Sequence, residues 1–596
     1  MWIILQFSSF YISLCSLGSR KRGAKLLLIH KDLRLSLTET LLQQELLSHD
    51  AAPVASLSCI WLPCSLHAAW RAIQGAPGED YPLDGVTGVQ GIKAQQDLPE
   101  SLQCLTFGRE FNQSLEQATL PRGLQSLAFG DQFNQRLERV IFPDSLQSLT
   151  FGDGFNQSLQ QVVFPDGLKC LTFGDGFNQS LQGVSFPKNL ESLWLGRRFN
   201  QTLERVGLPK DLKSLRFGDG FNLSLEQVTL PANLEVLTFG EQFNQSLEHV
   251  KLPKLERLIL GGRFNRSLEH VLLPSCLQLL TLGADFNQSL HSTTLPSTLR
   301  SLTFGREFNQ PLDGMTFPDL EILTFGFEYN QSLENVNLPG TLLSLTLGYR
   351  FNHSLEKVGL PYNLESLTLG CEFSYTLENV TLPSLRQLVL GSRFNQSANQ
   401  LTLPPSLQSL TFGDGFNQCW EQVTLPSTLQ NLTFGNHFNH SLTHATLPGS
   451  LNSLTFGHCF NQCLEHVVFP SSLESLTFGS EFNQSLERVT LPSNLRNLTF
   501  GSRFNQSLDS VTLPASLQSL TFGYRFNQSL EHIAFPDSLE TLIFGQNFNQ
   551  KLERVIWPSA LRSLIFDQNF NQKLETVTPP SSLDTFSCQG ISVSCK

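Results

Sequence analysis

The sequence repeats itself with a period of about 22 residues, and this period limits what the chain can fold into. The dodecapeptide LTFGDGFNQSLQ occupies residues 149–160 and recurs unchanged at residues 171–182. A Phe-Asn pair, or a close variant of it, occurs 22 times, in steps of 22 residues or occasionally 21. The length of 596 residues alone would suggest about four domains. A fixed period overrides that estimate and indicates one repeat array.

Each repeat, numbered from its proline, follows the pattern P-x-x-L-x-x-L-x-F-G-x-x-F-N-Q-S-L-E-x-V-x-L. Apolar and polar residues alternate at positions 7 to 9 and 20 to 22, which is typical of strands, and no helical stripe is present. The fold class predicted is therefore a mainly β repeat solenoid of about 22 coils, with two short parallel strands in each coil. Strands in successive coils would lie about 4.8 Å apart.

The most regular positions of the repeat predict its core. Leucine fills positions 4 and 7 in all 22 repeats, and phenylalanine fills position 13 in 21, with Tyr329 as the exception. Glycine fills position 10 in 21 repeats, with Asp567 as the exception, and this predicts a positive φ or a close backbone approach. Ala398 and Trp420 replace leucine at position 17, so we expect a local packing defect near residues 395–420.

An asparagine at position 14 follows this phenylalanine in nearly every repeat, and Ser374 is the one substitution. Its amide can donate and accept hydrogen bonds along a stack of coils. We therefore predict a structural ladder rather than a catalytic role. In the first five repeats it consists of Asn112, Asn134, Asn156, Asn178 and Asn200.

These residues resemble the FNIP repeat family, a relative of the leucine-rich repeats named for a Phe-Asn-Ile-Pro signature. The segment Phe308-Asn309-Gln310-Pro311 is nearest to that signature, and most other repeats have serine in place of the proline. The resemblance covers residues 99–579 and implies a right-handed repeat solenoid. It implies architecture more than activity, although some members of the family carry an F-box before the repeats.

The chain on either side of the array lacks the repeat. Residues 1–98 are expected to form a small mixed or helical region that caps one end, with a capping box at Ser36-Leu-Thr-Glu39 opening a helix to about residue 48. Residues 580–596 form a degenerate tail, and a poorly capped strand edge predicts end-to-end self-association. The apolar residues 2–17 follow no basic residue and are short for a membrane span, so we expect neither a secretory signal nor a membrane partner.

The compartment and the class of partner follow from glycosylation sequons, cysteines and charge. Many ladder asparagines lie in Asn-Gln-Ser sequons, and a glycan there would block stacking. The twelve cysteines follow no period, unlike those of a disulfide scaffold. Both observations predict a cytoplasmic protein. The formal net charge of −12 argues against nucleic acid as a general partner.

Charge is patterned along the repeats. Position 18 is acidic in 17 of 22 repeats, which predicts an acidic stripe on one edge of the solenoid. One interpretation is a solvated edge that keeps the array soluble. The other is a surface that grips a basic partner. In the first eight repeats the stripe consists of Glu116, Glu138, Glu204, Glu226, Glu248 and Glu269.

The strongest metal candidates are two pairs of residues in neighbouring repeats. His437 and Cys459 share position 12, and His444 and His466 share position 19. Zinc needs four ligands that converge at about 2.0–2.3 Å, whereas these two positions lie at different points around a coil. We therefore expect no metal and no cofactor. The sequence also has no phosphate-binding loop and no nucleophile motif, so we expect no enzyme.

Three interpretations of function remain. The favoured one is a non-enzymatic scaffold that binds a protein partner, of unknown identity, along the repeat surface. The second is an F-box substrate adaptor of a ubiquitin ligase, with residues 30–75 docking to the ligase. The third is an extracellular adhesive or ice-binding solenoid, suggested by threonine columns at position 8. Arg216 at position 8 and Arg257 at position 6 interrupt that surface.

Overall fold

The computed structural model describes residues 101–397, 401–420, 423–567 and 569–572. It also describes shorter pieces at residues 4–7, 10–13, 60–61, 88–90, 98, 580, 582–588 and 591–594. The chain divides into two compact units, one ending at Leu299 and the other dominated by residues from Arg300 onward. We call residues 101–299 the first array and the described residues from 300 onward the second array. The predicted helix at residues 36–48 and the F-box candidate at residues 30–75 lie almost wholly outside the described residues.

Every described coil contributes one strand of three residues, at positions 6 to 8 of the repeat. In the first array these are β5 (Cys104–Thr106), β6 (Ser126–Ala128), β7 (Ser148–Thr150), β8 (Cys170–Thr172), β9 (Ser192–Trp194), β10 (Ser214–Arg216), β11 (Val236–Thr238), β12 (Arg257–Ile259) and β13 (Leu279–Thr281). In the second array they are β14 (Ser301–Thr303), β15 (Ile322–Thr324), β16 (Ser344–Thr346), β17 (Ser366–Thr368), β18 (Gln387–Val389), β19 (Ser409–Thr411), β20 (Asn431–Thr433), β21 (Ser453–Thr455), β22 (Ser475–Thr477), β23 (Asn497–Thr499), β24 (Ser519–Thr521), β25 (Thr541–Ile543) and β26 (Ser563–Ile565). Longer strands follow at β27 (Thr585–Cys588) and β28 (Ile591–Ser594), and short ones precede the arrays at β1 (Ile4–Phe7), β2 (Phe10–Ser13), β3 (Ile60–Trp61) and β4 (Gly88–Gln90).

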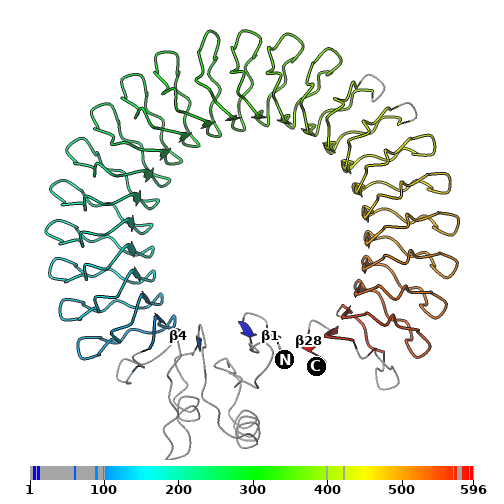
Figure 1. Ribbon diagram of the computed structural model, residues 1–596, viewed down its shortest axis with the longest axis horizontal. Coiled ribbons are helices and arrows are strands. Elements are labelled where there is room, and N and C mark those ends of the chain that lie inside the picture. Colours follow the sequence, from blue (N-terminus) through cyan, green and yellow to red (C-terminus); the bar gives the residue numbers. More distant parts are fainter. Residues whose placement is uncertain are drawn as a thin grey trace, which may run out of the picture. The chain divides into compact units, whose positions relative to one another are not determined.

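Within each array the strands of successive coils, through β27, pair in parallel with no shift of register, and β28 pairs antiparallel with β27 at the end of the second array. Leu149 of β7, for example, lies opposite Leu171 of β8. The ladder extends one residue past the strand, because the Phe151 amide donates to the Thr172 carbonyl at 2.9 Å. Figure 1 shows the strands side by side along one edge of the coils in each array, with turns along the other edge. The prediction of a parallel β-solenoid is confirmed.

The second strand predicted at positions 20 to 22 does not form as a strand in the described coils. In its place there are two isolated parallel bridges, Thr316 with Asn337 and Thr424 with Thr446. The reason is the spacing between coils. The ring centroids of Phe142 and Phe164, at position 22 of adjacent coils, are 6.4 Å apart, against 5.4 Å for Phe151 and Phe173 beside the paired strands. Side chains of neighbouring coils are thus more widely spaced at position 22 than next to the strands, where the backbones pair at about 4.8 Å.

The core consists of columns of leucine and phenylalanine. Phe151 and Phe155, at positions 9 and 13 of one coil, stack with their ring centroids 4.1 Å apart. The next rings along the two columns, Phe173 and Phe177, follow at 5.4 Å and 6.1 Å. Leu149 and Phe155 are fully buried. Because each ring is covered by the rings of neighbouring coils, the stack supplies the burial that one coil lacks.

The glycine at position 10 is required by a close backbone approach. A Cβ atom at Gly479 would overlap the carbonyl group of Gly457 in the preceding coil, and the same holds along both arrays. The alternative expectation of a positive φ does not apply at this position. In the described residues positive φ occurs at position 19 instead, in Gly183, Arg205 and Gly314.

Trp420 is the largest side chain of the core and is fully buried. Its ring lies edge-on to four neighbouring phenylalanine rings, among them Phe434 at 4.9 Å. The indole Nε1 has no hydrogen-bond partner in the described residues. Ala398, at the same repeat position in the preceding coil, lies outside the described residues, so the expected void there stays a prediction.

Replacing Tyr329 with phenylalanine is expected to stabilise the second array by about 1 kcal/mol. Tyr329 is fully buried, and its hydroxyl has no partner in the described residues. Burial, with a contribution from the charge of Asp313, raises the pKa of this phenol well above its usual value. The neutral hydroxyl is therefore favoured in the fold, and stability falls as the pH rises above the unfolded-state pKa of about 10.

The measurement is the urea unfolding midpoint of wild type and Tyr329→Phe at neutral pH and above pH 10. The stability advantage of Tyr329→Phe should grow at the higher pH. Tyr349→Phe is the matched control, because Tyr349 is 43 % exposed. A gain of equal size in the control would show that the buried hydroxyl is not the cause.

Candidate protein-binding surface

The strands present positions 6 and 8 outward and position 7 to the core, and we call the outward side the strand face. In most coils its residues are serine and threonine. The predicted threonine column, Thr433, Thr455, Thr477, Thr499 and Thr521, lies on the adjacent strands β20 to β24, where each side chain is half-buried. Small β-branched residues are what a regular strand face favours in any case.

Departures from this regularity are scattered in the second array, as at Ile322, Val389 and Ile543, but cluster in one stretch of the first array. On β9 to β13, six of the ten outward positions carry larger side chains, whereas on β5 to β8 all eight carry serine, threonine, cysteine or alanine. The departures occur on consecutive strands, so they lie together in space. We call this set the Trp194 patch, and it consists of Trp194, Arg216, Val236, Arg257, Ile259 and Leu279.

Strand register places these side chains in two rows. Trp194, Arg216 and Ile259 lie in the row of position 8, with Thr238 between the last two. Val236, Arg257 and Leu279 lie in the row of position 6. Trp194 is 44 % exposed, and the guanidinium carbon of Arg216 lies 5.4 Å from the centroid of its indole ring. This cation–π contact holds a large aromatic surface on the outside of the fold.

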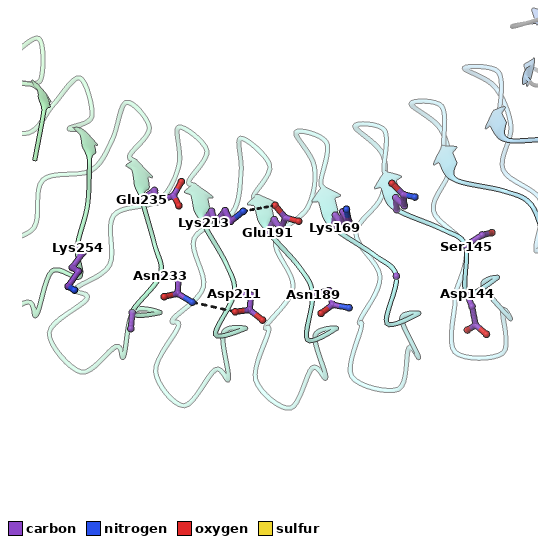
Figure 2. A pocket seen from close by; sticks show the side chains of 13 residues that line it. Asp144, Ser145, Lys169, Asn189, Glu191, Asp211, Lys213, Asn233, Glu235 and Lys254 are labelled. Carbon is purple, nitrogen blue, oxygen red and sulfur yellow. Dashed lines mark hydrogen bonds and ion pairs between the residues drawn. The ribbon is translucent and has the colours of Figure 1, made fainter. Parts of the chain in front are cut away.

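A shallow groove of about 740 Å³ borders the patch on the side where the strands begin. Figure 2 shows Lys169, Glu191, Lys213 and Glu235 in one row along the groove, at position 5 of successive coils. Lys213 donates a hydrogen bond to Glu191 at 3.1 Å, and this contact lowers the pKa of the Glu191 carboxyl. Since both groups are exposed, the pair adds little stability. It presents alternating charge to a ligand on the strand face.

The asparagines at position 14 form a column of hydrogen bonds between coils. The Oδ1 atom of Asn134 accepts from the backbone amide of Asn156 at 2.9 Å and from the side chain of Gln157 at 3.1 Å. The same backbone contact links Asn112 to Asn134 and continues through Asn178 to Asn200. The backbone amide at position 14 therefore has its acceptor in the asparagine side chain of the preceding coil.

Replacing Asn505 with alanine is expected to cost about 1–2 kcal/mol of the free energy of unfolding. Its Oδ1 accepts from the Asn527 amide at 2.9 Å and from Gln528 at 3.1 Å. Alanine leaves the Asn527 amide unsatisfied in a half-buried site, while Gln528 keeps its bond to the backbone carbonyl of residue 505 at 3.0 Å. Asn505→Asp keeps the acceptor oxygen and is the control, with a smaller expected loss. Urea unfolding of the three proteins is the measurement. Equal losses for both variants would contradict the ladder.

The predicted acidic stripe lies on the exposed turn after position 17. All six of its residues in the first array are exposed: Glu116, Glu138, Glu204, Glu226, Glu248 and Glu269. None of these six forms an ion pair within the described residues. In the second array the equivalent carboxylates of Glu334, Glu465 and Glu531 pair with a basic residue of the next coil. The stripe is thus partly neutralised in one array and free in the other.

The predicted metal candidates stay at different points around the coil. His437 and Cys459 occupy the turn after the core glycine, and His444 and His466 occupy the turn that carries the acidic stripe. In the described ranges no group of three or more histidine, cysteine or acidic side chains is arranged to hold a metal ion. Those ranges also contain no helix that is long and apolar enough to cross a bilayer.

Several residues of interest were missed by the sequence reasoning. Trp194 carries a detectable signal, since it stands where 15 of the 21 other repeats have threonine, but its significance becomes apparent only when neighbouring strands are viewed as one surface. The serine or threonine at position 3 was also missed. The Ser145 Oγ, for example, lies 2.7 Å from the Arg122 carbonyl oxygen and 2.6 Å from the Leu124 carbonyl oxygen in the preceding coil, and its one hydrogen can be donated to either. The sequence signal for this contact is the recurrence of serine or threonine at position 3, which we treated as a variable position.

Comparison with known proteins places this architecture in a family. The FNIP Repeat profile matches the chain in overlapping segments that together span residues 94–585. The solved structure titled CroV588, a novel circular LRR protein, is similar at 38 % identity and a TM-score of 0.66, covering 84 % of this chain and 81 % of that one.

A second solved structure, the internalin InlF from Listeria monocytogenes, shares 13 % identity at a TM-score of 0.26, covering 67 % of this chain and 86 % of its own. No curated protein matches the chain. The FNIP match covers far more than half of the sequence, and its repeats coincide with the coils of the structure. The protein therefore belongs to the FNIP repeat family, with a solenoid like that of leucine-rich-repeat proteins.

Proposed function

We propose that this protein is a non-enzymatic scaffold that binds a partner protein on the strand face of the first array, with the Trp194 patch as anchor. The observation that carries the proposal is the clustering of six large side chains on the five consecutive strands β9 to β13, next to strands β5 to β8 that present only small ones. Exposed tryptophan and arginine are the residues that most often dominate binding energy at protein interfaces. The solenoid supplies a rigid support on which these side chains are already placed, which reduces the entropy lost on binding.

A partner bound here would contact Trp194 and Ile259 with apolar side chains and meet the groove with polar ones. Protein–protein interfaces have an apolar core and a polar rim. The apolar side chains of the Trp194 patch would correspond to the core, and the charged groove beside it to the rim. Thr238 lies at the centre of the patch, opposite Arg216 on one side and Ile259 on the other. A photoreactive amino acid at residue 238 would therefore report contact directly, and Trp194 shows that position 8 tolerates a large ring.

Replacing Trp194 with threonine, which restores the repeat consensus, is expected to lower partner binding about tenfold or more without loss of fold. The measurement is photocrosslinking from residue 238 in an extract of the native cell, with and without Trp194→Thr. Crosslinker at residue 477 on β22 is the positional control, and Ile543→Thr is the matched consensus substitution in the second array. Crosslinks at residue 238 that persist unchanged in Trp194→Thr would overturn the proposal.

A further inference from the structure

The Trp194 patch concentrates positive charge that has no acidic counterpart on the strand face. Arg216 and Arg257 are the charged residues at positions 6 and 8 of the first array, and none of these positions carries a carboxylate. Both arginines are exposed, and neither forms an ion pair within the described residues. Lys213 and Arg197, by contrast, pair with Glu191 and Asp219. Arg136 and Lys251 form no ion pair in the described part of the chain, but they lie away from the strand face. The two guanidinium groups are therefore available to an external carboxylate.

Strand geometry fixes the separation of the two arginines. Arg216 lies on β10 and Arg257 on β12, in different rows, with β11 between them. Two strand spacings across and two residues along place their Cα atoms about 12 Å apart. An extended chain advances about 3.1–3.3 Å per residue, so carboxylates on one face match this separation when they are four residues apart in a β conformation or three apart in a polyproline II conformation. The line between the arginines passes over Val236 and Thr238 on β11, where an aliphatic side chain can rest.

We propose that the Trp194 patch binds an extended acidic segment of the partner protein, carrying two carboxylates three or four residues apart with an apolar residue between them. This inference rests on the proposed function and names the chemistry of its ligand. Arginine presents a planar fork that matches a carboxylate in a bidentate way. Aromatic or aliphatic side chains of the segment contact Trp194 and Ile259.

Surrounding charge favours a short acidic segment over a nucleic acid. Glu191, Glu235 and Glu256 occupy position 5 beside the patch, and the whole chain has a formal net charge of −12. A phosphate backbone carries one charge per nucleotide and would meet these carboxylates as well as the arginines. A peptide with two acids can reach both guanidinium groups and direct neutral residues toward the glutamates.

The test is selection of random linear peptides on the full chain in four forms. These are wild type, Arg216→Thr/Arg257→Ser, the charge reversal Arg216→Glu/Arg257→Glu, and the control Arg136→Ser/Lys251→Thr. The first double variant and the control both restore repeat consensus and remove two positive charges from exposed sites of the first array. They differ in whether the charges belong to the patch. Circular dichroism melting curves verify that all four forms are folded.

Wild type and the control are expected to enrich peptides with two acidic residues three or four positions apart. A synthetic peptide selected on wild type should bind Arg216→Thr/Arg257→Ser about tenfold or more weakly. The charge reversal should switch enrichment to lysine and arginine. Acidic enrichment that survives loss of both arginines would overturn the proposal. The proposal would also be overturned if the selected peptides showed no acidic bias and single-stranded RNA bound in a way that depends on these two arginines.

The binding surface and its preference for acidic segments are refuted by different results. Selected peptides that depend on Trp194 but contain no acidic pair would leave the binding surface in place and refute only its charge preference. Peptide binding and photocrosslinks that are both unaffected by Trp194→Thr would refute the surface itself.

Discussion

Gly479→Ala is expected to cost about 3 kcal/mol or more of the free energy of unfolding, although it adds one methyl group. The new Cβ would overlap the carbonyl carbon and oxygen of Gly457 and approach the backbone nitrogen of His458. These are main-chain atoms of the adjacent coil, held by the strand ladder on one side. They cannot rotate away as a flexible side chain would, so the two coils must separate and lose stacking.

The control for this prediction lies in the neighbouring coil. A methyl group added at Gly449, at position 2, would meet no atom within 4 Å, and the φ of this glycine is not in the left-handed region. Gly449→Ala should be neutral or stabilising by up to about 1 kcal/mol, because alanine restricts the unfolded chain. Urea unfolding followed by circular dichroism compares the two variants with wild type. Similar midpoints for Gly479→Ala and Gly449→Ala would show that close approach does not explain the recurrent glycine of the repeat.

Individual positions of the repeat show which parts of this fold can be predicted from the sequence. The leucines at positions 4 and 7 and the phenylalanine at position 13 indicate the core directly, because a side chain repeated at a fixed period must occupy one column of a stack. The strand at positions 6 to 8 follows from local alternation. The glycine at position 10 was correctly associated with close approach, but its alternative, a positive φ, could be discarded only once the backbone was known.

The second predicted strand shows why alternation alone is insufficient. Val-Thr-Leu at positions 20 to 22 has the apolar–polar pattern of a strand, and Val162 and Phe164 are indeed buried. Whether such a segment pairs depends on the distance to the next coil, and the wider spacing there is a property of the whole coil. Phe142 and Phe164 at 6.4 Å record that spacing. No single repeat encodes it, so the sequence could not distinguish a strand from an extended turn.

The candidate site was harder to predict for a related reason. Arg216 and Arg257 were recognised only as interruptions of a threonine array, since they stand 41 residues apart in the sequence. Strand register brings them within two strands of each other and places Arg216 beside Trp194. In a solenoid a binding surface is made of single residues from successive coils, so it emerges when repeats are aligned and compared column by column. Departures from the consensus, rather than the consensus itself, carry the information about the ligand.

Phe177→Ala is expected to cost about 3–5 kcal/mol and to loosen the first array locally. Phe177 is fully buried, and its ring stacks on Phe173 at 4.0 Å and on Phe155 and Phe199 at 6.1 Å each. Removing it opens a cavity that three rings line, and the coils are held apart by the rest of the repeat, so the space cannot close. Phe177→Leu fills most of that volume and should cost about 1–2 kcal/mol.

Because each coil contacts only its neighbours, the damage from Phe177→Ala should decay with distance along the array. Backbone amides of β7 to β9 are expected to exchange hydrogen faster than in wild type, while those of β21 to β23 in the second array stay unchanged. Hydrogen exchange measured by mass spectrometry on wild type, Phe177→Ala and Phe177→Leu resolves this. A uniform rise in exchange over both arrays would mean that the solenoid unfolds as one cooperative body, and the nearest-neighbour account of its stability would be wrong.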